Sequence, residues 1–195
     1  MNQSNIKELR LAFYSTSSQA FLLMIMVSSY FVYTPIILKE LSISLTQFAL
    51  GITAFGIFNI ITNQLVTRFL IPNIGTTNCL IIARITYAFL PFFIFYLSSY
   101  YYFIFLSMLW GVGMGFQVPS VFTQVAIIES NTKKVLNPVF KGIAAIGSII
   151  GAIIASFCLG NNIDAKLLFL ILGILVFTST VFLKLFGLSK QYDYI

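Results

Sequence analysis

The sequence predicts an all-α integral membrane protein, a six-transmembrane-helix bundle. Of its 195 residues, 59% are hydrophobic and only 8% are charged, whereas about a quarter of the residues of a typical soluble domain are charged. The uncharged stretches are also long enough to cross a bilayer core, which takes about 20 apolar residues in a helix. So few charges cannot cover a water-soluble globule, and that class of protein is excluded.

Cysteine content, charge and the N-terminal segment exclude further classes. Cys79 and Cys158 both lie in apolar stretches, so no disulfide framework is expected. The formal net charge is +6, but the basic residues are scattered along the chain. No basic stripe forms, and we expect no nucleic-acid partner. The first ten residues are polar and no small-residue cleavage site follows the first apolar run, so a cleaved signal peptide is not expected.

The first two helices follow from uncharged stretches. Residues 11–38 carry no charge and are followed by Lys39 and Glu40, which predicts the first helix. Residues 42–66 predict the second helix, which ends before Arg68. Residues 71–77 contain Pro72, Asn73 and Gly75. These are turn residues, so the chain is expected to reverse there.

The remaining helices follow from one long apolar run and two polar links. Residues 85–128 are uncharged and would extend roughly 65 Å as a single helix, too far for one span. We expect a hairpin at 96–102, where tyrosines that favour the headgroup level flank two serines. The predicted helices are 78–97, 101–128, 139–160 and 166–187. Residues 1–10 and 189–195 then form an N-terminal segment and a tail around a six-helix domain at 11–188.

The basic residues predict the orientation in the membrane. Loops on the side of the N-terminus hold most of them, whereas Lys39 and Lys166 lie on the opposite side. Positive charge accumulates on the cytoplasmic side, so both termini are expected in the cytoplasm, from an inner or plasma membrane. The residues on the N-terminal side are Lys7, Arg10, Arg68, Lys133, Lys134, Lys141, Lys184 and Lys190.

Small residues recur on the predicted fourth and fifth helices, where they let helix backbones approach closely in lipid. We favour tight structural packing as their role, with a smooth contact that permits rocking as the alternative. Pro119, in the same fourth helix, removes one backbone hydrogen bond and is expected to bend it. The helix-packing candidates besides Pro119 are Gly111, Gly113, Gly115, Gly147, Gly151 and Ala155.

Polar side chains inside the predicted spans are candidates for a substrate cavity. Gln117 and Gln124 lie seven positions apart on one helix face, with Ser120 nearly between them. An amide facing hydrocarbon is costly, so these side chains face either other helices or a water-filled cavity. Interhelical hydrogen bonding and cavity lining both remain open. The candidates are Gln19, Asn59, Asn63, Gln117, Ser120 and Gln124.

Four residues near the cytoplasmic loops are gating candidates. They are Arg68, Gly75, Arg84 and Glu129. Arg84 lies inside the third span, and we favour snorkelling of its side chain to the headgroups. Glu129 and its neighbouring lysines form either a gating or dipole-complementing cluster or a set of solvated loop charges, and we favour the latter.

Two tyrosines fall near the outer end of the first predicted helix. They are Tyr30 and Tyr33. Tyrosine is enriched at membrane–water interfaces, where its ring is buried and its hydroxyl stays hydrated. We therefore interpret both as interface anchors.

Several catalytic groups are missing from the sequence. The chain has no histidine, no acid in the middle of a span and no P-loop glycine-lysine motif. Histidine-based metal sites and relays, an intramembrane aspartyl pair and a nucleotide site are therefore excluded. We expect no metal, no cofactor, no catalytic residue and no enzyme activity.

The helix pattern resembles the N-terminal half of a major facilitator superfamily (MFS) transporter. The resemblance covers about residues 10–188 and includes six spans, a turn-rich second-to-third loop, a glycine-rich fourth helix and a small-residue fifth helix. It implies one half of a twelve-helix protein. Such proteins move small solutes by alternating access, with the substrate site between the two halves near the membrane midplane.

The family's sequence motifs are only partly present. The second-to-third loop usually resembles G-x-x-x-D-R-x-G-R-R, and its counterpart here, RFLIPNIGTT, retains Gly75. Pro72 takes the place of the acid, so the charge pairing of the inward gate is lost. The fourth-helix pattern R-x-x-x-G-x-G matches Gly111 and Gly113, with Ser107 in place of the arginine.

The resemblance implies membrane transport of a small solute by alternating access. The chain would act as a half-size or truncated secondary transporter, because it ends where the family's central loop would begin. Its expected partners are the lipid bilayer, an unidentified solute, and either a second six-helix half or a second copy in a homodimer. The alternative is a non-transporting scaffold or assembly protein, or an inactive transporter fragment.

Overall fold

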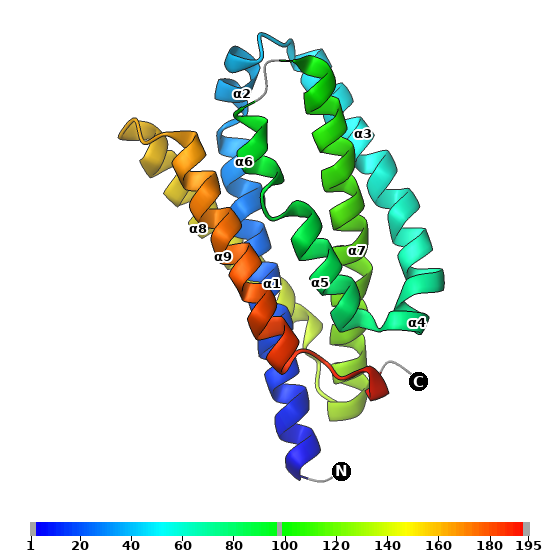
Figure 1. The fold of residues 1–195 in the computed structure, drawn as a ribbon. Coiled ribbons are helices and arrows are strands. Elements are labelled where there is room, and N and C mark those ends of the chain that lie inside the picture. The colour runs from blue at the N-terminus through cyan, green and yellow to red at the C-terminus, as the bar shows by residue number, and fades with distance from the viewer. Residues whose placement is uncertain (1–2, 97–98, 193–195) are drawn as a thin grey trace.

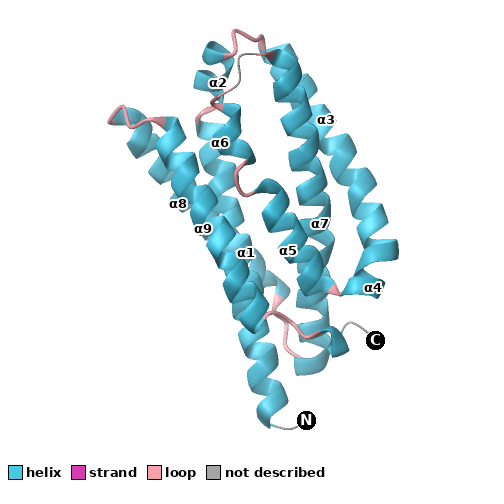
Figure 2. Ribbon diagram, viewed as in Figure 1, coloured by secondary structure: helices cyan, strands magenta, loops and turns pink. Residues whose placement is uncertain are grey.

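The computed structural model describes residues 3–96 and 99–192, and this part of the chain contains helices and short links but no strand (Figures 1 and 2). Six helical stretches in it are long and apolar enough to cross a membrane. The predicted all-α fold class with six transmembrane helices is therefore confirmed. The stretches are Ile6–Val32, Leu45–Ile74, Thr76–Ile94, Tyr100–Thr132, Asn137–Gly160 and Ala165–Phe186.

The second and third spans are built from several helical segments, and the other four are continuous. In chain order the segments are α1 (Gln3–Val32), α2 (Thr34–Glu40), α3 (Leu45–Leu65), the π-helical turn η1 (Val66–Leu70), α4 (Ile71–Ile74), α5 (Thr76–Tyr87), α6 (Leu90–Ile94), α7 (Tyr100–Thr132), α8 (Asn137–Gly160), α9 (Ala165–Phe186) and the 3₁₀ turn η2 (Lys190–Tyr192). The hairpin predicted at 96–102 includes residues 97–98, and the terminal segments include 1–2 and 193–195. These positions lie outside the described residues.

Proline explains why the helix breaks after the first span and within the third. Pro35 and Pro91 lie in the first turns of α2 and α6, where a missing N–H costs little. In a continuous helix each ring would collide with the carbonyl four residues earlier. The third predicted helix, 78–97, is therefore interrupted at residues 88–89, between α5 and α6.

The predicted loop at 71–77 is largely helical. The second span continues through η1 and α4, and the Ile71 N–H donates to the carbonyl of Val66, five residues back. This wider turn accommodates Pro72, which has no N–H to donate. The chain reverses at Gly75, whose φ of 86° lies in the region that favours glycine.

The helices form two layers. In one layer α1 and α7 are neighbours, with α8 packed on α1 and α3 packed on α7, while α5 and α9 cover the other side of α1 and α7. Both described ends of the chain and the links α4–α5 and α7–α8 lie at one end of the bundle (Figure 1). The links α2–α3 and α8–α9 lie at the opposite end.

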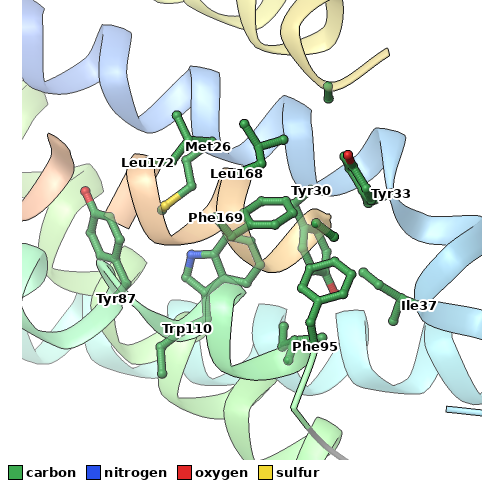
Figure 3. Packing of buried hydrophobic residues seen from close by; sticks show 14 of the residues in the cluster. Met26, Tyr30, Tyr33, Ile37, Tyr87, Phe95, Trp110, Leu168, Phe169 and Leu172 are labelled. Atoms are coloured by element: carbon green, nitrogen blue, oxygen red, sulfur yellow. The ribbon is translucent and has the colours of Figure 1, made fainter. Parts of the chain in front are cut away.

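An aromatic core fills the bundle toward the α2–α3 end. The Tyr30 and Trp110 rings meet edge to face at 4.8 Å, and Phe95 stacks on Phe169 at 5.2 Å (Figure 3). Tyr30 and Tyr33 are each 1% exposed. The interpretation of these two tyrosines as interface anchors is therefore wrong, because their helix face packs against α7 and α9 rather than headgroups.

Small residues lie at the closest helix contacts. On α8, Gly147 faces the Phe21 carbonyl of α1, and a Cβ at Gly151 would collide with the carbonyl of Ile25. Ser29 on α1 donates a hydrogen bond to the Gly151 carbonyl at 3.0 Å. Ala155, one turn further along α8, is fully buried.

The glycines of α7 face different helices. Gly111 lies against the Phe55 carbonyl of α3, and Gly115 lies against Thr62 of the same helix. Gly113 lies against Tyr87 of α5. The small residues of α7 and α8 therefore pack against α3, α5 and α1 and not against each other.

Substituting Gly151→Ala should destabilise the protein by about 1–3 kcal/mol, because the added methyl group overlaps backbone that cannot move aside. Gly142→Ala on the same helix is the matched control, since its Cβ would meet nothing within 4 Å. That control should be neutral or gain up to about 1 kcal/mol of helix propensity. Thermal unfolding with a thiol-reactive dye measures both, because Cys79 and Cys158 are buried. Equal midpoints for the two variants would contradict the packing.

Candidate functional site

A cavity of about 300 Å³ lies between α1, α7 and α8, and we call it the inner cavity. Its walls are mainly apolar and include Met24, Met114 and Val121. The polar residues that line it are Gln117, Lys141 and Ser148. This size and this mixture of an apolar wall with few polar groups are typical of small-molecule sites.

A larger hollow of about 770 Å³ follows along the same three helices, nearer the end with both termini, and we call it the vestibule. Three cations line it, namely Arg10, Lys133 and Lys134. None of the described residues that line it is acidic.

Gln117 connects the inner cavity to the interior of the bundle. Its side chain is 2% exposed, and its Oε1 accepts a hydrogen bond from the Tyr87 hydroxyl at 3.3 Å. Its Nε2 donates to no acceptor among the described residues. A buried amide donor left open in this way is costly unless a ligand or water accepts from it.

Arg84 lies inside the bundle, behind Tyr87. The side chain is 0% exposed, its Nη2 donates to the Gln19 carbonyl at 2.6 Å, and its guanidinium carbon lies 5.5 Å from the centre of the Tyr87 ring. Its Nε and Nη1 find no acceptor among the described residues. The snorkelling interpretation is therefore wrong, because the Arg84 side chain is buried and reaches a carbonyl of α1 inside the bundle instead of the headgroups.

Gln19 is held in place by α9. Its Oε1 accepts from the Ser179 hydroxyl at 3.0 Å, and its Nε2 donates to the Ser179 carbonyl at 3.2 Å. The Gln19 side chain is thus fully buried in an interhelical contact. Its role near Arg84 is to fix the carbonyl that the guanidinium reaches.

Gln124 forms an interhelical network. Its Oε1 accepts from the Thr16 hydroxyl at 2.5 Å, and its Nε2 donates to the hydroxyls of Thr76 and Thr77 at 3.1 and 2.9 Å. These contacts join α7 to α1 and α5. Of the two glutamines, Gln117 therefore lies at the inner cavity and Gln124 in a hydrogen-bonded helix contact.

Comparison with known families decides the class of protein. The family model described as the Major Facilitator Superfamily matches residues 16–193. The chain belongs to this superfamily. The resemblance found in the sequence is confirmed, and membership supports a transporter-type function in a multi-pass membrane protein. No match was found among curated proteins or solved structures.

The loop that carries the superfamily's charge motif is held here by hydrogen bonds to backbone carbonyls. The Thr77 hydroxyl donates to the Leu188 carbonyl at 2.7 Å, and the Lys190 Nζ donates to the Asn73 carbonyl at 2.6 Å. These contacts fasten residues 187–192 across the α4–α5 link. Arg68 is exposed and lies over the Phe69 ring.

Glu129 caps α8. Its Oε1 accepts from the backbone N–H groups of Leu136 and Asn137 at 2.6 and 2.7 Å. A carboxylate at a helix N-terminus compensates unpaired N–H groups and the helix dipole. The interpretation as a solvated loop charge is therefore wrong for Glu129, and the dipole-complementing alternative describes it.

The remaining candidates do not line the inner cavity. Asn59 and Asn63 are half-buried on α3, which does not line the inner cavity, and Asn63 Oδ1 accepts from the Thr67 hydroxyl at 3.3 Å. The Ser120 hydroxyl donates to the Phe116 carbonyl of its own helix. Pro119 is buried within α7, between the cavity glutamine and the network glutamine.

Tyr87 was not singled out by the sequence, although it links Arg84 to Gln117. Its position three residues after Arg84 places the two side chains on neighbouring parts of one helix face. This spacing is the feature of the sequence that could have pointed to Tyr87. It does not reveal that the opposite end of the tyrosine reaches a glutamine on another helix.

Replacing Arg84 by methionine should raise the stability of the protein. A buried charge with open donors is unfavourable, and substitution of buried charged groups by apolar ones often gains about 1–4 kcal/mol. The midpoint of thermal unfolding, compared with that of the surface variant Lys7→Met, measures the gain. A clear loss of stability in Arg84→Met would show that the guanidinium is compensated inside the bundle.

Proposed function

We propose that this protein moves a small solute across an inner or plasma membrane by alternating access, as one six-helix half of an MFS transporter. The inner cavity is its share of the substrate site. The observation that carries the proposal is Gln117, a buried amide that lines an apolar cavity between three membrane-spanning helices and whose Nε2 has no acceptor among the described residues. Apolar contact would hold the solute, and the amide would orient it.

A second half completes the site in this proposal. Substrate sites of the superfamily lie between two repeats, and the layer that contains the inner cavity has large exposed apolar faces. Part of these faces contacts lipid, and part is available to a separate six-helix half or to a second copy of this chain. The residues include Ile57, Ile60 and Leu65 on α3 and Ile149, Ile153 and Phe157 on α8.

The vestibule fits an inward-open arrangement. It opens at the end of the bundle that carries most of the basic residues, which we assign to the cytoplasm. A solute would then pass between the vestibule and the inner cavity along α1, α7 and α8.

A non-transporting scaffold or assembly protein is the second candidate. The hydrogen bonds to backbone carbonyls at the α4–α5 link favour it, because they stand in place of the charge pairing of the family's gate. A scaffold would use the same exposed faces of α3 and α8 without moving a solute.

Transport tests the first proposal directly. Proteoliposomes containing the chain would be incubated with a panel of sugars, amino acids, organic acids and organic amines, and their contents measured by mass spectrometry. We expect at least one solute to accumulate above empty liposomes, and Gln117→Leu to slow its uptake about tenfold, the effect of one lost hydrogen bond.

Gln64→Leu is the matched control for transport, because Gln64 is exposed on α3 and does not line the inner cavity. Co-expression with a second half and crosslinking of the chain to itself distinguish the two pairings. Uptake that is absent for every solute and every pairing supports the scaffold.

Cysteine labelling tests the separate positions of the two glutamines. In a background with Cys79 and Cys158 replaced by alanine, Gln117→Cys should react with a water-soluble methanethiosulfonate, because position 117 lies at the cavity wall. Gln124→Cys should react at least tenfold more slowly, because position 124 is enclosed by α1, α5 and α7. Similar rates at both positions would refute this assignment.

A further inference from the structure

The charges along the route to the inner cavity have a single sign. The vestibule is lined by Arg10, Lys133 and Lys134, and the inner cavity by Lys141, while none of the described residues lining either space is acidic. Cations gathered in a concave space with apolar walls attract anions and repel cations.

The polar group deepest in this route is a hydrogen-bond donor. Gln117 lines the inner cavity and its enclosed Nε2 has no acceptor among the described residues, while Oε1 of the same amide accepts from the Tyr87 hydroxyl. The amide is therefore poised to donate. The matching group on a ligand is an oxygen that accepts this hydrogen bond.

Arg84 adds a positive field behind this amide. Its guanidinium contacts the Tyr87 ring, and Tyr87 in turn binds Gln117, so the charge lies behind the residue that borders the cavity. The described carboxylates are Glu8, Glu40, Glu129 and Asp164, which lie near helix ends, and none accepts from Arg84 Nε or Nη1. An arginine stays charged when buried, and its field is weakly screened there.

We propose that the inner cavity binds a small organic anion with an apolar body, for which Gln117 donates a hydrogen bond and Lys141 and Arg84 supply the favourable potential. The apolar walls accept the body of the molecule, and the vestibule raises the local concentration of anions. This inference rests on the proposed function, because it names the solute class of the same cavity.

A series of ligands with the same body and different charge tests the proposal. The probes are 3-phenylpropionate, 3-phenylpropanol and 3-phenylpropylammonium, and their binding to the purified full chain is followed by the thermal shift reported by the two buried cysteines. We expect the carboxylate to bind at least tenfold more tightly than the alcohol, and the ammonium to bind weakest. Absence of carboxylate binding, or an equal affinity for all three, overturns the proposal.

Three variants test which residues cause the preference for the carboxylate. Gln117→Leu should weaken carboxylate binding about tenfold, and Lys141→Gln about threefold with a smaller dependence on salt. Arg84→Met should weaken binding of the carboxylate but not of the alcohol, because Arg84 does not line the cavity and acts through its charge. Gln64→Leu and Lys7→Gln, both exposed and outside the cavity, should change nothing. An unchanged carboxylate preference in both Gln117→Leu and Lys141→Gln overturns the proposal even if Arg84→Met does not fold.

An anionic lipid headgroup and a soluble organic anion are both negatively charged, so either could occupy the cavity. Nanodiscs of phosphatidylcholine, with and without phosphatidylglycerol, distinguish the two sources. An equal affinity for 3-phenylpropionate in both supports the soluble anion. Competition by phosphatidylglycerol assigns the cavity to lipid and overturns the solute form of the proposal.

The proposed function and this inference fail separately. Binding of the carboxylate without uptake into proteoliposomes leaves the anion site intact and refutes transport. Uptake of a cationic or neutral solute that depends on Gln117, without preference for the carboxylate, supports transport and refutes the anion site.

Discussion

Backbone contact at small residues is the constraint on which this bundle depends. Lipid provides no hydrophobic force between helices, so the helices associate through van der Waals contact and hydrogen bonds. Gly147 and Gly151 bring α8 onto α1, and Gly111 and Gly115 bring α7 onto α3. These two pairs set the layer α8–α1–α7–α3, and the inner cavity lies where α1, α7 and α8 diverge from one another.

Polar contacts then determine how α5 and α9 cover that layer. Gln124 bonds to hydroxyls of α1 and α5, and Gln19 bonds to Ser179 of α9. Each contact satisfies groups that would otherwise be left open in hydrocarbon. Gln117 is the exception among these glutamines, because its Oε1 is bonded within the bundle and its Nε2 has no acceptor among the described residues. A uniformly structural role would not leave that donor unpaired.

The fold class and the number of spans could be predicted because they depend on charge density and on the lengths of apolar runs. The helix break before Pro91 could also be predicted, because the proline ring collides with the preceding helical turn and this collision depends only on the local sequence. The position of the Arg84 side chain could not be predicted. A long cationic side chain inside a span can reach either headgroups or the bundle interior, and the choice depends on which face of α5 meets the other helices. Likewise, Gln117 and Gln124 share one helix face, and only the neighbouring helices make one a cavity residue and the other a network residue.

Arg84 brings stability and function into conflict. Burial of a guanidinium with two open donors is unfavourable, whereas the buried amides of Gln124 and Gln19 are well bonded. An apolar residue would pack there at lower cost, so stability alone gives no reason for arginine. A positive charge behind Gln117 has an effect where a mobile anion enters the neighbouring cavity, because the anion lowers the electrostatic energy of both partners.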